Sequence, residues 1–372
     1  MRVPSIKTAT KIVLLLSILF PSIAIAQIDG RSFSPWRHIG GLEFLTLDIA
    51  PQNAALANAG VANPNGGFLQ NPALLASQKD NLTLSAQYSR WMRSAGIRDF
   101  HYGAARVGIR LDDKRVIGLS YQQFSSFLTD WFFEPVLPIH QLSPRLYYAQ
   151  NQRRFNWGVS LGYVRARLDA FSSVPRESEG ITLSGGISTN PYQFWGASWV
   201  FAASLSDLGP RQTIKPPQTN RRYSHSYLPT TFRIGGQSSI SKPNTRFNIH
   251  YQFEHLLVPR DLDSINSGWF APIQSIHDAP WGQNWQEWQF KLGLEWTQIA
   301  LGERLALGLR LGWQYEAPEQ GDRHLLTTGF GLQSKYLALD MAYWVPLNGN
   351  WGLANTMIFG LAYRWNPEKT DR

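Results

Sequence analysis

Histidine, serine and acidic side chains are the residue types in this sequence that could support catalysis. His250 lies two positions before Gln252 and four before Glu254, and Ser120 or Ser160 could complete a Ser-His-acid arrangement. A histidine that hydrogen-bonds polar neighbours on a strand needs no catalytic role. We therefore interpret His250 as a structural polar residue.

Metal and cofactor chemistry has little support in the sequence. Asp99 and His101 are the best-spaced candidate metal ligands, but two ligands without a third favour ordinary polar residues. The chain has no cysteine, which excludes thiolate zinc sites, disulfides and cysteine nucleophiles. It also lacks a Gly-x-Ser-x-Gly elbow, a His-Glu-x-x-His helix, a P-loop and a complete dinucleotide glycine motif. We expect no catalytic, metal-binding or cofactor-binding residues, no cofactor, and a protein that is not an enzyme.

The elements that carry these side chains show the two-residue alternation of β-strands. One segment alternates large apolar residues, Leu305, Leu307, Leu309, Leu311 and Trp313, with small or charged ones, Arg304, Ala306, Gly308, Arg310 and Gly312. Charges facing the core of a soluble sandwich would each cost several kcal/mol. A membrane barrel instead places the apolar rows against lipid and the polar rows in a wet lumen, with aromatic residues near the two interfaces. The alternation therefore favours the barrel.

Segments of this kind recur along the chain at the length that crosses a bilayer at a tilt. The expected strands are 82–92, 101–111, 115–126, 143–153, 156–167, 179–188, 194–206, 229–239, 245–254, 285–297, 304–315, 323–332, 335–345 and 355–365. Connections after even-numbered strands are short and most of those after odd-numbered strands are long, as expected for periplasmic turns and external loops. The expected fold class is all-β, a transmembrane antiparallel β-barrel of about 14 strands with a short N-terminal plug-like segment.

Residues 1–26 have the features of a secretory signal peptide. Arg2, Lys7 and Lys11 precede the apolar run 12–23 and a small-x-small cleavage site at 24–26, so the mature chain is expected to start at Gln27. No later apolar run approaches the roughly 18 to 20 residues of a membrane-spanning helix. An exported barrel is expected in the outer membrane of a Gram-negative bacterium.

The expected organisation is a signal peptide at 1–26, an N-terminal plug or periplasmic segment at 27–81, the barrel at 82–366 and a tail at 367–372. Residues 45–82 are rich in Ala, Asn, Gly and Pro and show no strand period, which indicates one or two short helices and turns. Such a segment either plugs the lumen or forms a periplasmic linker.

The formal net charge of +9 is scattered, without a basic run, and does not predict a nucleic-acid partner. Charged residues spaced through the strands are expected to line the lumen. The inward-facing set is Arg106, Arg110, Lys291, Glu295 and Arg310.

The predicted external loops hold the best candidates for partner binding, since contiguous exposed aromatics mark contact surfaces. The aromatic candidates are Trp131, Phe132, Phe133, Trp269, Phe270 and Trp281. Packing onto the barrel rim is the alternative interpretation. Arg211, Arg221 and Arg222 lie in a basic loop that either contacts lipopolysaccharide phosphates or an acidic partner, or is simply solvated.

Several motifs, in order, resemble the FadL-like PorV/PorQ group of outer-membrane proteins. They are residues 54–62 (AALANAGVA) with 71–73 (NPA), 205–209 (LSDLG) with 228–235 (LPTTFRIG), 255–259 (HLLVP) and 352–356 (GLANT). The resemblance covers almost all of the chain after the signal peptide. It implies a fourteen-stranded FadL-type barrel.

The resemblance also implies a role in the type IX secretion system. Members of the group bind the large outer-membrane translocon barrel, accept secreted cargo proteins through their C-terminal signal domains and pass them to the sortase attachment complex. The implied protein is a non-enzymatic shuttle or adaptor, in contact with outer-membrane lipid and lipopolysaccharide.

Two other functions remain open from the residues. The first is a FadL-like outer-membrane transporter of hydrophobic small molecules, which a dry apolar pocket beside the plug would favour and a charged, occluded lumen would not. The second is an accessory to a lipopolysaccharide-modifying hydrolase.

Overall fold

The computed structural model describes residues 42–91, 100–126, 139–168, 176–214, 224–257, 269, 271–274, 288–300, 305–317, 323–348 and 355–366. The chain divides into two units, Met1–Ser32 and Phe33–Arg372, and all described residues belong to the second. The predicted signal peptide, 1–26, and the predicted tail, 367–372, lie outside the described residues.

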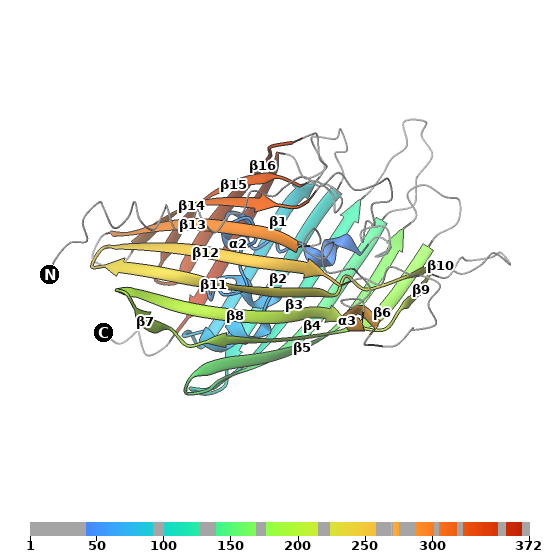
Figure 1. Ribbon diagram of the computed structural model, residues 1–372, viewed down its shortest axis with the longest axis horizontal. Coiled ribbons are helices and arrows are strands. Elements are labelled where there is room, and N and C mark those ends of the chain that lie inside the picture. Colours follow the sequence, from blue (N-terminus) through green and yellow to red (C-terminus); the bar gives the residue numbers. More distant parts are fainter. Residues whose placement is uncertain are drawn as a thin grey trace. The chain divides into compact units, whose positions relative to one another are not determined.

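Fourteen long antiparallel strands close into a barrel (Figure 1). They are β1 (Leu82–Trp91), β2 (Phe100–Arg110), β3 (Arg115–Ser126), β4 (Ile139–Asn151), β5 (Phe155–Leu168), β6 (Arg176–Thr189), β8 (Ala197–Leu208), β11 (Thr231–Lys242), β12 (Thr245–Leu256), β13 (Trp288–Ala300), β14 (Leu305–Tyr315), β15 (Leu325–Ser334), β16 (Leu337–Pro346) and β17 (Thr356–Trp365). Each strand pairs with its neighbours in sequence, β8 pairs with β11, and β1 pairs with β17. The predicted fold class and strand number are confirmed.

Three short strands lie outside this set. β7 (Tyr192–Phe194) continues the β6–β8 hairpin around a tight turn in which Trp195 and Gly196 both have positive φ, 51° and 74°. β9 (Gln212–Ile214) and β10 (Ser224–Ser226) form a separate hairpin. No strand was predicted at β9 or β10, because three-residue strands are too short for alternation to be visible.

Short and long connections alternate along the barrel, as predicted. The chain crosses from β2 to β3 with residues 111–114, from β4 to β5 with 152–154, and from β15 to β16 with 335–336. Connections at the other end run as long as 257–287, between β12 and β13. The short turns mark the periplasmic end.

The two faces of the wall differ as a membrane barrel requires. On β14, Leu309 and Leu311 are 47% and 46% exposed on the outer face, while the Arg310 side chain between them is only 8% exposed. Apolar exposure of this kind recurs on nearly every long strand and matches a lipid-facing surface. Among the described residues, no helix is long and apolar enough to span a membrane.

Residues 42–81 lie within the barrel (Figure 1). They contain η2 (Glu43–Thr46), α2 (Pro51–Ala54), η3 (Gly67–Leu69) and η4 (Pro72–Ser77). The segment has no strand period, and its short helices start at prolines or after caps: Asn71 accepts a hydrogen bond from the Ala73 N–H, and a proline opens both α2 and η4. We call residues 42–81 the plug.

Apolar packing fixes the external half of the plug. Leu42, Phe44 and Ile49 join a buried cluster with Tyr102 and Trp344 from the wall. The Tyr102 hydroxyl donates to the carbonyl oxygens of Phe44 and Leu47, at 2.9 and 3.1 Å. The remaining structure, a four-residue helix α3 (Ala271–Gln274), lies in the long β12–β13 connection.

Candidate functional site

The plugged lumen is the candidate functional site, and glycines in the wall make room for it. A Cβ on Gly158 would lie 2.6 Å from the carbonyl carbon and oxygen of Pro72, and one on Gly312 would lie 2.3 Å from the Ala57 nitrogen. A Cβ on Gly186, Gly235, Gly293, Gly329 or Gly360 would instead approach plug side chains, those of Asn71, Val61, Leu56, Ala55 and Pro51. The plug backbone therefore approaches the wall at distances that only glycine permits.

A buried aspartate anchors the middle of the plug. Asp48 accepts hydrogen bonds from the Arg106 guanidinium at 2.7 Å, from the Asn53 amide at 2.6 Å and from the Ala50 N–H at 2.9 Å. The Arg106 and Asp48 side chains are each 3% exposed, and Arg106 also donates to the Gly66 carbonyl at 3.0 Å. One wall arginine thus holds two separate parts of the plug.

A second charged network joins the plug to strands β13, β14 and β16. Arg310 bridges Glu295 and Asp340 at 2.7 Å to each, and the Gln52 amide of the plug donates to Asp340 at 2.8 Å. His250 Nε2 lies 3.8 Å from Glu295 Oε2, whereas Arg310 bonds Oε1 of the same carboxylate. Fully buried charges require such partners, because an unpaired one costs several kcal/mol.

A third network centres on Glu254. Its carboxylate accepts from Arg233 at 2.9 Å, Lys291 at 2.7 Å and Gln252 at 2.9 Å. The Gln252 amide oxygen accepts the plug's Val61 N–H at 2.8 Å. Two cations around one carboxylate leave this part of the wall locally positive.

The wall is irregular beside a fourth buried pair, Arg145 and Asp207, which lie 2.8 Å apart and are each 3% exposed. Asp207 has a positive φ of 59°, and the register of β6 with β8 shifts between Leu183 and Gly185. These features together form a bulge, a device that bends a strand and redirects a side chain.

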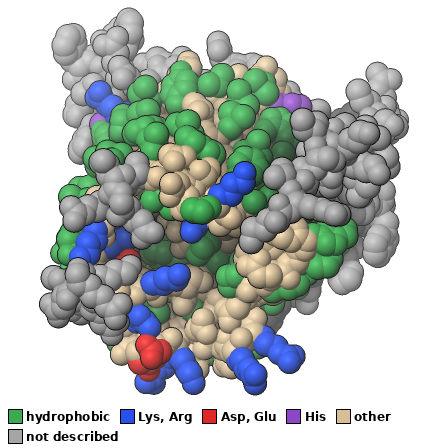
Figure 2. All heavy atoms as spheres, turned by 90° about the vertical axis from the view of Figure 1, so that its left-hand side faces the viewer, with side chains coloured by type: hydrophobic (Ala, Val, Ile, Leu, Met, Phe, Trp, Pro, Cys, Tyr) green, Lys and Arg blue, Asp and Glu red, His purple; other side chains and the backbone are tan. Residues whose placement is uncertain are grey.

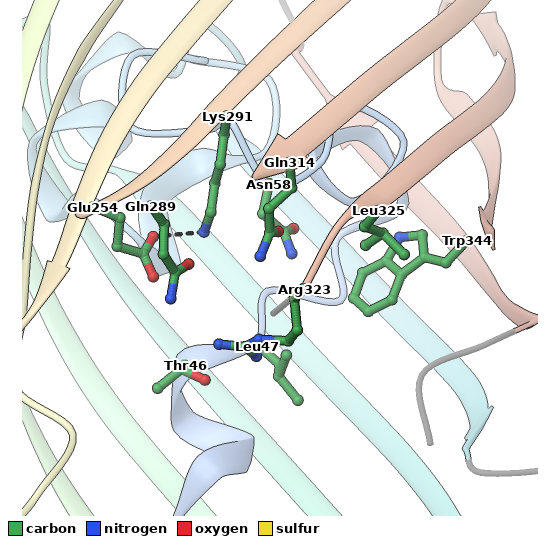
Figure 3. Close-up of a pocket in the computed structure, with 10 residues that line it drawn as sticks. All are labelled: Thr46, Leu47, Asn58, Glu254, Gln289, Lys291, Gln314, Arg323, Leu325 and Trp344. Atoms are coloured by element: carbon green, nitrogen blue, oxygen red, sulfur yellow. Dashed lines mark hydrogen bonds and ion pairs between the residues drawn. The ribbon is translucent and has the colours of Figure 1, made fainter. Parts of the chain in front are cut away.

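A small polar cavity remains between the plug and the external half of the wall (Figure 3). It measures about 30 Å³, which is room for about two water molecules. The lining residues are Thr46, Leu47, Asn58, Glu254, Gln289, Lys291, Gln314, Arg323, Leu325 and Trp344. Figure 3 shows the Asn58, Gln314 and Lys291 side-chain ends pointing into it. Seven of the ten lining residues are polar or charged, and a cavity of this size has room for water.

Four of the five residues predicted to face the lumen are buried within it. Arg106, Lys291, Glu295 and Arg310 are buried in the networks above. Arg110 has the same orientation but lies at the periplasmic mouth, where it is partly exposed and pairs with Asp113 at 2.6 Å.

No catalytic arrangement forms around His250. Its nearest acid is Glu295 rather than Glu254, and the Ser120 hydroxyl lies 3.2 Å from the Tyr147 hydroxyl. His101 stacks on Tyr88 and bonds its hydroxyl at 2.7 Å, while Asp99 lies outside the described residues. Within the described part of the chain no three His, Asp or Glu residues gather as metal ligands.

The predicted partner-binding residues are mostly outside the described ranges: Trp131, Phe132, Phe133, Phe270, Trp281, Arg221 and Arg222. Trp269 is described and is 38% exposed. Arg211 lies over the Tyr227 ring, with 5.9 Å from its guanidinium carbon to the ring centroid. Their binding role stays a prediction.

The plug's own polar residues were not predicted from the sequence. Asp48, Gln52 and Asn53 lie in a segment without a periodic pattern, so nothing in their spacing indicated that they meet Arg106 and Asp340. Arg145 and Arg233 were also missed, although alternation on β4 and β11 would have placed both in the inner row.

Comparison with known proteins finds no matching family model and no matching curated protein. Among solved structures, the CymD monoaromatic hydrocarbon channel aligns with 85% of this chain and 97% of its own, at 10% identity and a TM-score of 0.51. The chain has a FadL-like barrel fold.

Two further structures match less closely. A FadL homologue of Pseudomonas aeruginosa aligns with 85% of this chain and 98% of its own, at 10% identity and a TM-score of 0.43. A TodX deltaS2S3 mutant, a monoaromatic hydrocarbon channel, aligns with 81% and 94%, at 10% identity and a TM-score of 0.47. At 10% identity the match to CymD shows the barrel fold alone, and it shows nothing about the ligand.

Proposed function

We propose that this FadL-like barrel is an outer-membrane adaptor of protein secretion that acts through its rims and not through its lumen. The observation that carries the proposal is the occlusion of the lumen. Two wall glycines contact the plug backbone directly. Asp48 and Gln52 tie the plug to the charged wall residues Arg106 and Asp340, and the Val61 N–H donates to the Gln252 amide oxygen. A pore that conducted small apolar molecules would need an apolar path, whereas the described lumen offers buried charge.

The motifs at 54–62, 71–73, 228–235 and 255–259 supply the specific pathway, type IX secretion. Two of them are structural in this fold: the first two lie in the plug, where Asn71 bonds the Val61 carbonyl at 2.9 Å. The proposed partners are a large translocon barrel, cargo proteins with a C-terminal signal domain, and the sortase attachment complex. Trp131, Phe132, Phe133 and Trp269 are the proposed external contacts.

The direct test is a pull-down of the tagged chain from detergent-solubilised membranes, with its partners identified by mass spectrometry. We expect a very large barrel and proteins that end in a common C-terminal domain. A variant with Trp131→Ala, Phe132→Ala and Phe133→Ala should recover less of both. If neither partner class co-purifies with the wild-type chain, the secretion proposal is wrong.

Transport of hydrophobic small molecules is the second candidate, and the fold comparison favours it. The structure adds one specific feature. Pairing of β4 with β5 passes from Leu142↔Arg165 to Arg145↔Gly162 with no partners between, where Pro144 has no N–H to donate. This gap lies near the β6–β8 bulge, and together they form the irregular part of the wall through which an apolar solute would leave sideways.

A covalent lock on the plug separates the two candidates. Gln52 and Asp340 meet at 2.8 Å, and the natural chain has no cysteine, so Gln52→Cys with Asp340→Cys provides one pair for a short thiol cross-linker. An adaptor should keep its cargo on the cell surface after cross-linking. A transporter with a moving plug should lose hydrocarbon uptake. The Gln52→Cys single variant, treated with the same reagent, is the control.

A further inference from the structure

The periplasmic end of the barrel is strongly basic. The described residues at this end include Lys79, Arg110, Lys114, Arg115, Arg153, Arg154, Lys242, Arg246, Lys335 and Arg364, against Asp80, Asp112 and Asp113. Figure 2 shows this face, with Lys and Arg side chains spread across it and acidic side chains at few places. Asp112 and Asp113 are already paired, with Arg115 and Arg110 at 2.6 Å each.

Part of this charge belongs to the inner row of the wall. Arg246 lies two residues before Asn248, which is buried and bonds Glu295 in the lumen. Arg364 lies four residues after Gly360, whose inner side contacts Pro51 of the plug. Alternation therefore places both arginines on the luminal side of the periplasmic mouth.

Lys79, at the end of the plug, adds a charge at the same mouth. It follows η4, and its carbonyl accepts a hydrogen bond from Arg110 at 3.1 Å. Its side chain is exposed. Lys79, Arg246 and Arg364 are called the mouth cations below.

The flanking segments do not carry the acidic residues needed to balance this charge. Residues 301–304, between β13 and β14, hold one glutamate and one arginine, and residues 367–372, after β17, hold two acidic and two basic residues, so neither segment adds net negative charge. The excess is therefore left for a partner, since a surface field of one sign attracts and orients ligands of the other.

We propose that the periplasmic mouth binds an acidic polypeptide segment whose carboxylates contact the mouth cations. Phospholipid headgroups, the other anions at this depth, lie outside the wall beside exposed aromatics such as Tyr192, Phe194 and Trp365. They reach outer-row residues such as Lys242 but not the luminal side of the mouth. A flexible acidic chain from the periplasm reaches it. This inference does not depend on the secretion proposal.

The test uses the full-length mature chain in nanodiscs of zwitterionic phosphatidylcholine and a fluorescein-labelled twelve-residue polyglutamate peptide. Fluorescence anisotropy should report saturable binding at low salt that weakens by about tenfold or more in 0.3 M NaCl, because exposed ion pairs are screened. A polyglutamine peptide of equal length should not bind. Absence of polyglutamate binding, or equal binding of polyglutamine, overturns the proposal.

Matched variants locate the site. The triple variant Lys79→Gln, Arg246→Gln, Arg364→Gln removes the mouth cations, and Lys114→Gln, Arg153→Gln, Lys335→Gln removes the same charge from the outer turns. We expect about a tenfold loss of peptide affinity for the first variant and a threefold loss or less for the second. Long-range attraction alone would instead lower the affinity of both variants equally, because both lose the same charge. Equal losses would show general attraction and overturn a mouth site.

Two controls keep the test decisive. If the first triple variant does not fold, as judged by heat-modifiable migration on gels, the single Arg246→Gln variant replaces it, with an expected loss of about threefold. Vesicles of phosphatidylglycerol test the lipid alternative. Binding of the detergent-solubilised chain to these vesicles that is lost in the mouth variant, without peptide binding, would overturn the peptide proposal in favour of lipid.

Discussion

At the scale of single residues, Gly158 shows how closely wall and plug are matched. The plug backbone at Pro72 and Ala73 occupies the space of a side chain on β5. Adding one methyl there forces the plug or the strand to move. Overpacking of this type costs about 1–3 kcal/mol.

We therefore expect Gly158→Ala to lower the urea stability of the detergent-purified barrel by about 1–3 kcal/mol and to expose the plug to protease. Gly185→Ala is the matched control, because a Cβ on that neighbouring-strand glycine would meet nothing nearer than the Gly158 carbonyl oxygen at 4.0 Å. Equal effects of the two substitutions would mean that plug contact is not the cause.

A second residue-scale feature is the Asp112 carboxylate in the β2–β3 turn. Two hydrogen bonds lower the pKa of Asp112 from 3.8 to about 2. The bond from the Arg115 guanidinium has the larger effect and the bond from the Lys114 N–H the next largest. Because the folded pKa is depressed, the stabilisation of the turn is present above pH 4 and is lost as the pH falls toward 2. Carboxyl-carbon NMR of the labelled protein should give a midpoint near 2, and Arg115→Gln should return it toward 3.8.

Sequence reasoning worked for wall residues because strand alternation fixes the side of each residue. It correctly put Arg106, Lys291, Glu295 and Arg310 in the lumen. It did not find Asp48, because pairing with Arg106 depends on a loop path 58 residues away in sequence that no local pattern encodes. The wall residues of each network were therefore predictable from the sequence, and the plug residues were not.

At the scale of elements, the plug depends on charge as well as on shape. Asp48→Asn leaves the buried Arg106 without its counter-charge, and breaking a buried pair costs about 3–5 kcal/mol. We expect the plug to loosen before the barrel unfolds, and limited proteolysis should then cut within residues 42–81 while the strands stay protected.

Asp113→Asn is the control for this prediction, since it breaks the exposed pair with Arg110, in which Asp113 is 95% exposed. Exposed pairs contribute little to stability. Plug cleavage that appears in both variants, or in neither, would argue against Asp48 as the anchor.

The strands themselves were predicted well and the plug only coarsely. All fourteen barrel strands were located to within four residues, because lipid on one side and a polar lumen on the other impose a strict period. The plug makes its hydrogen bonds to wall side chains and through short turns, so its one α-helical turn and three 3-10 helices left no periodic signal.

At the scale of the whole molecule, the filled lumen predicts that the barrel does not conduct ions. The described wall and plug leave a polar cavity of about 30 Å³. The chain in planar lipid bilayers should therefore give no stable conductance. Deleting residues 42–81 should give discrete channel openings, because water would then fill the lumen between the inner rows of side chains. Steady conductance of the wild-type chain would contradict an occluded lumen.

The pairing of β1 with β17 has a consequence for biogenesis. The plug precedes the wall in the sequence, but the wall residues that contact it lie in strands from both ends of the strand order. They are Gly108 and Gly118 in β2 and β3, and Gly312, Gly329, Trp344 and Gly360 in β14 to β17. A barrel that has not yet closed cannot hold the plug fully, since only part of the plug's binding surface is then assembled. Plug docking is thus coupled to closure of the β1–β17 seam, and a barrel stalled before closure would expose residues 42–81 to protease.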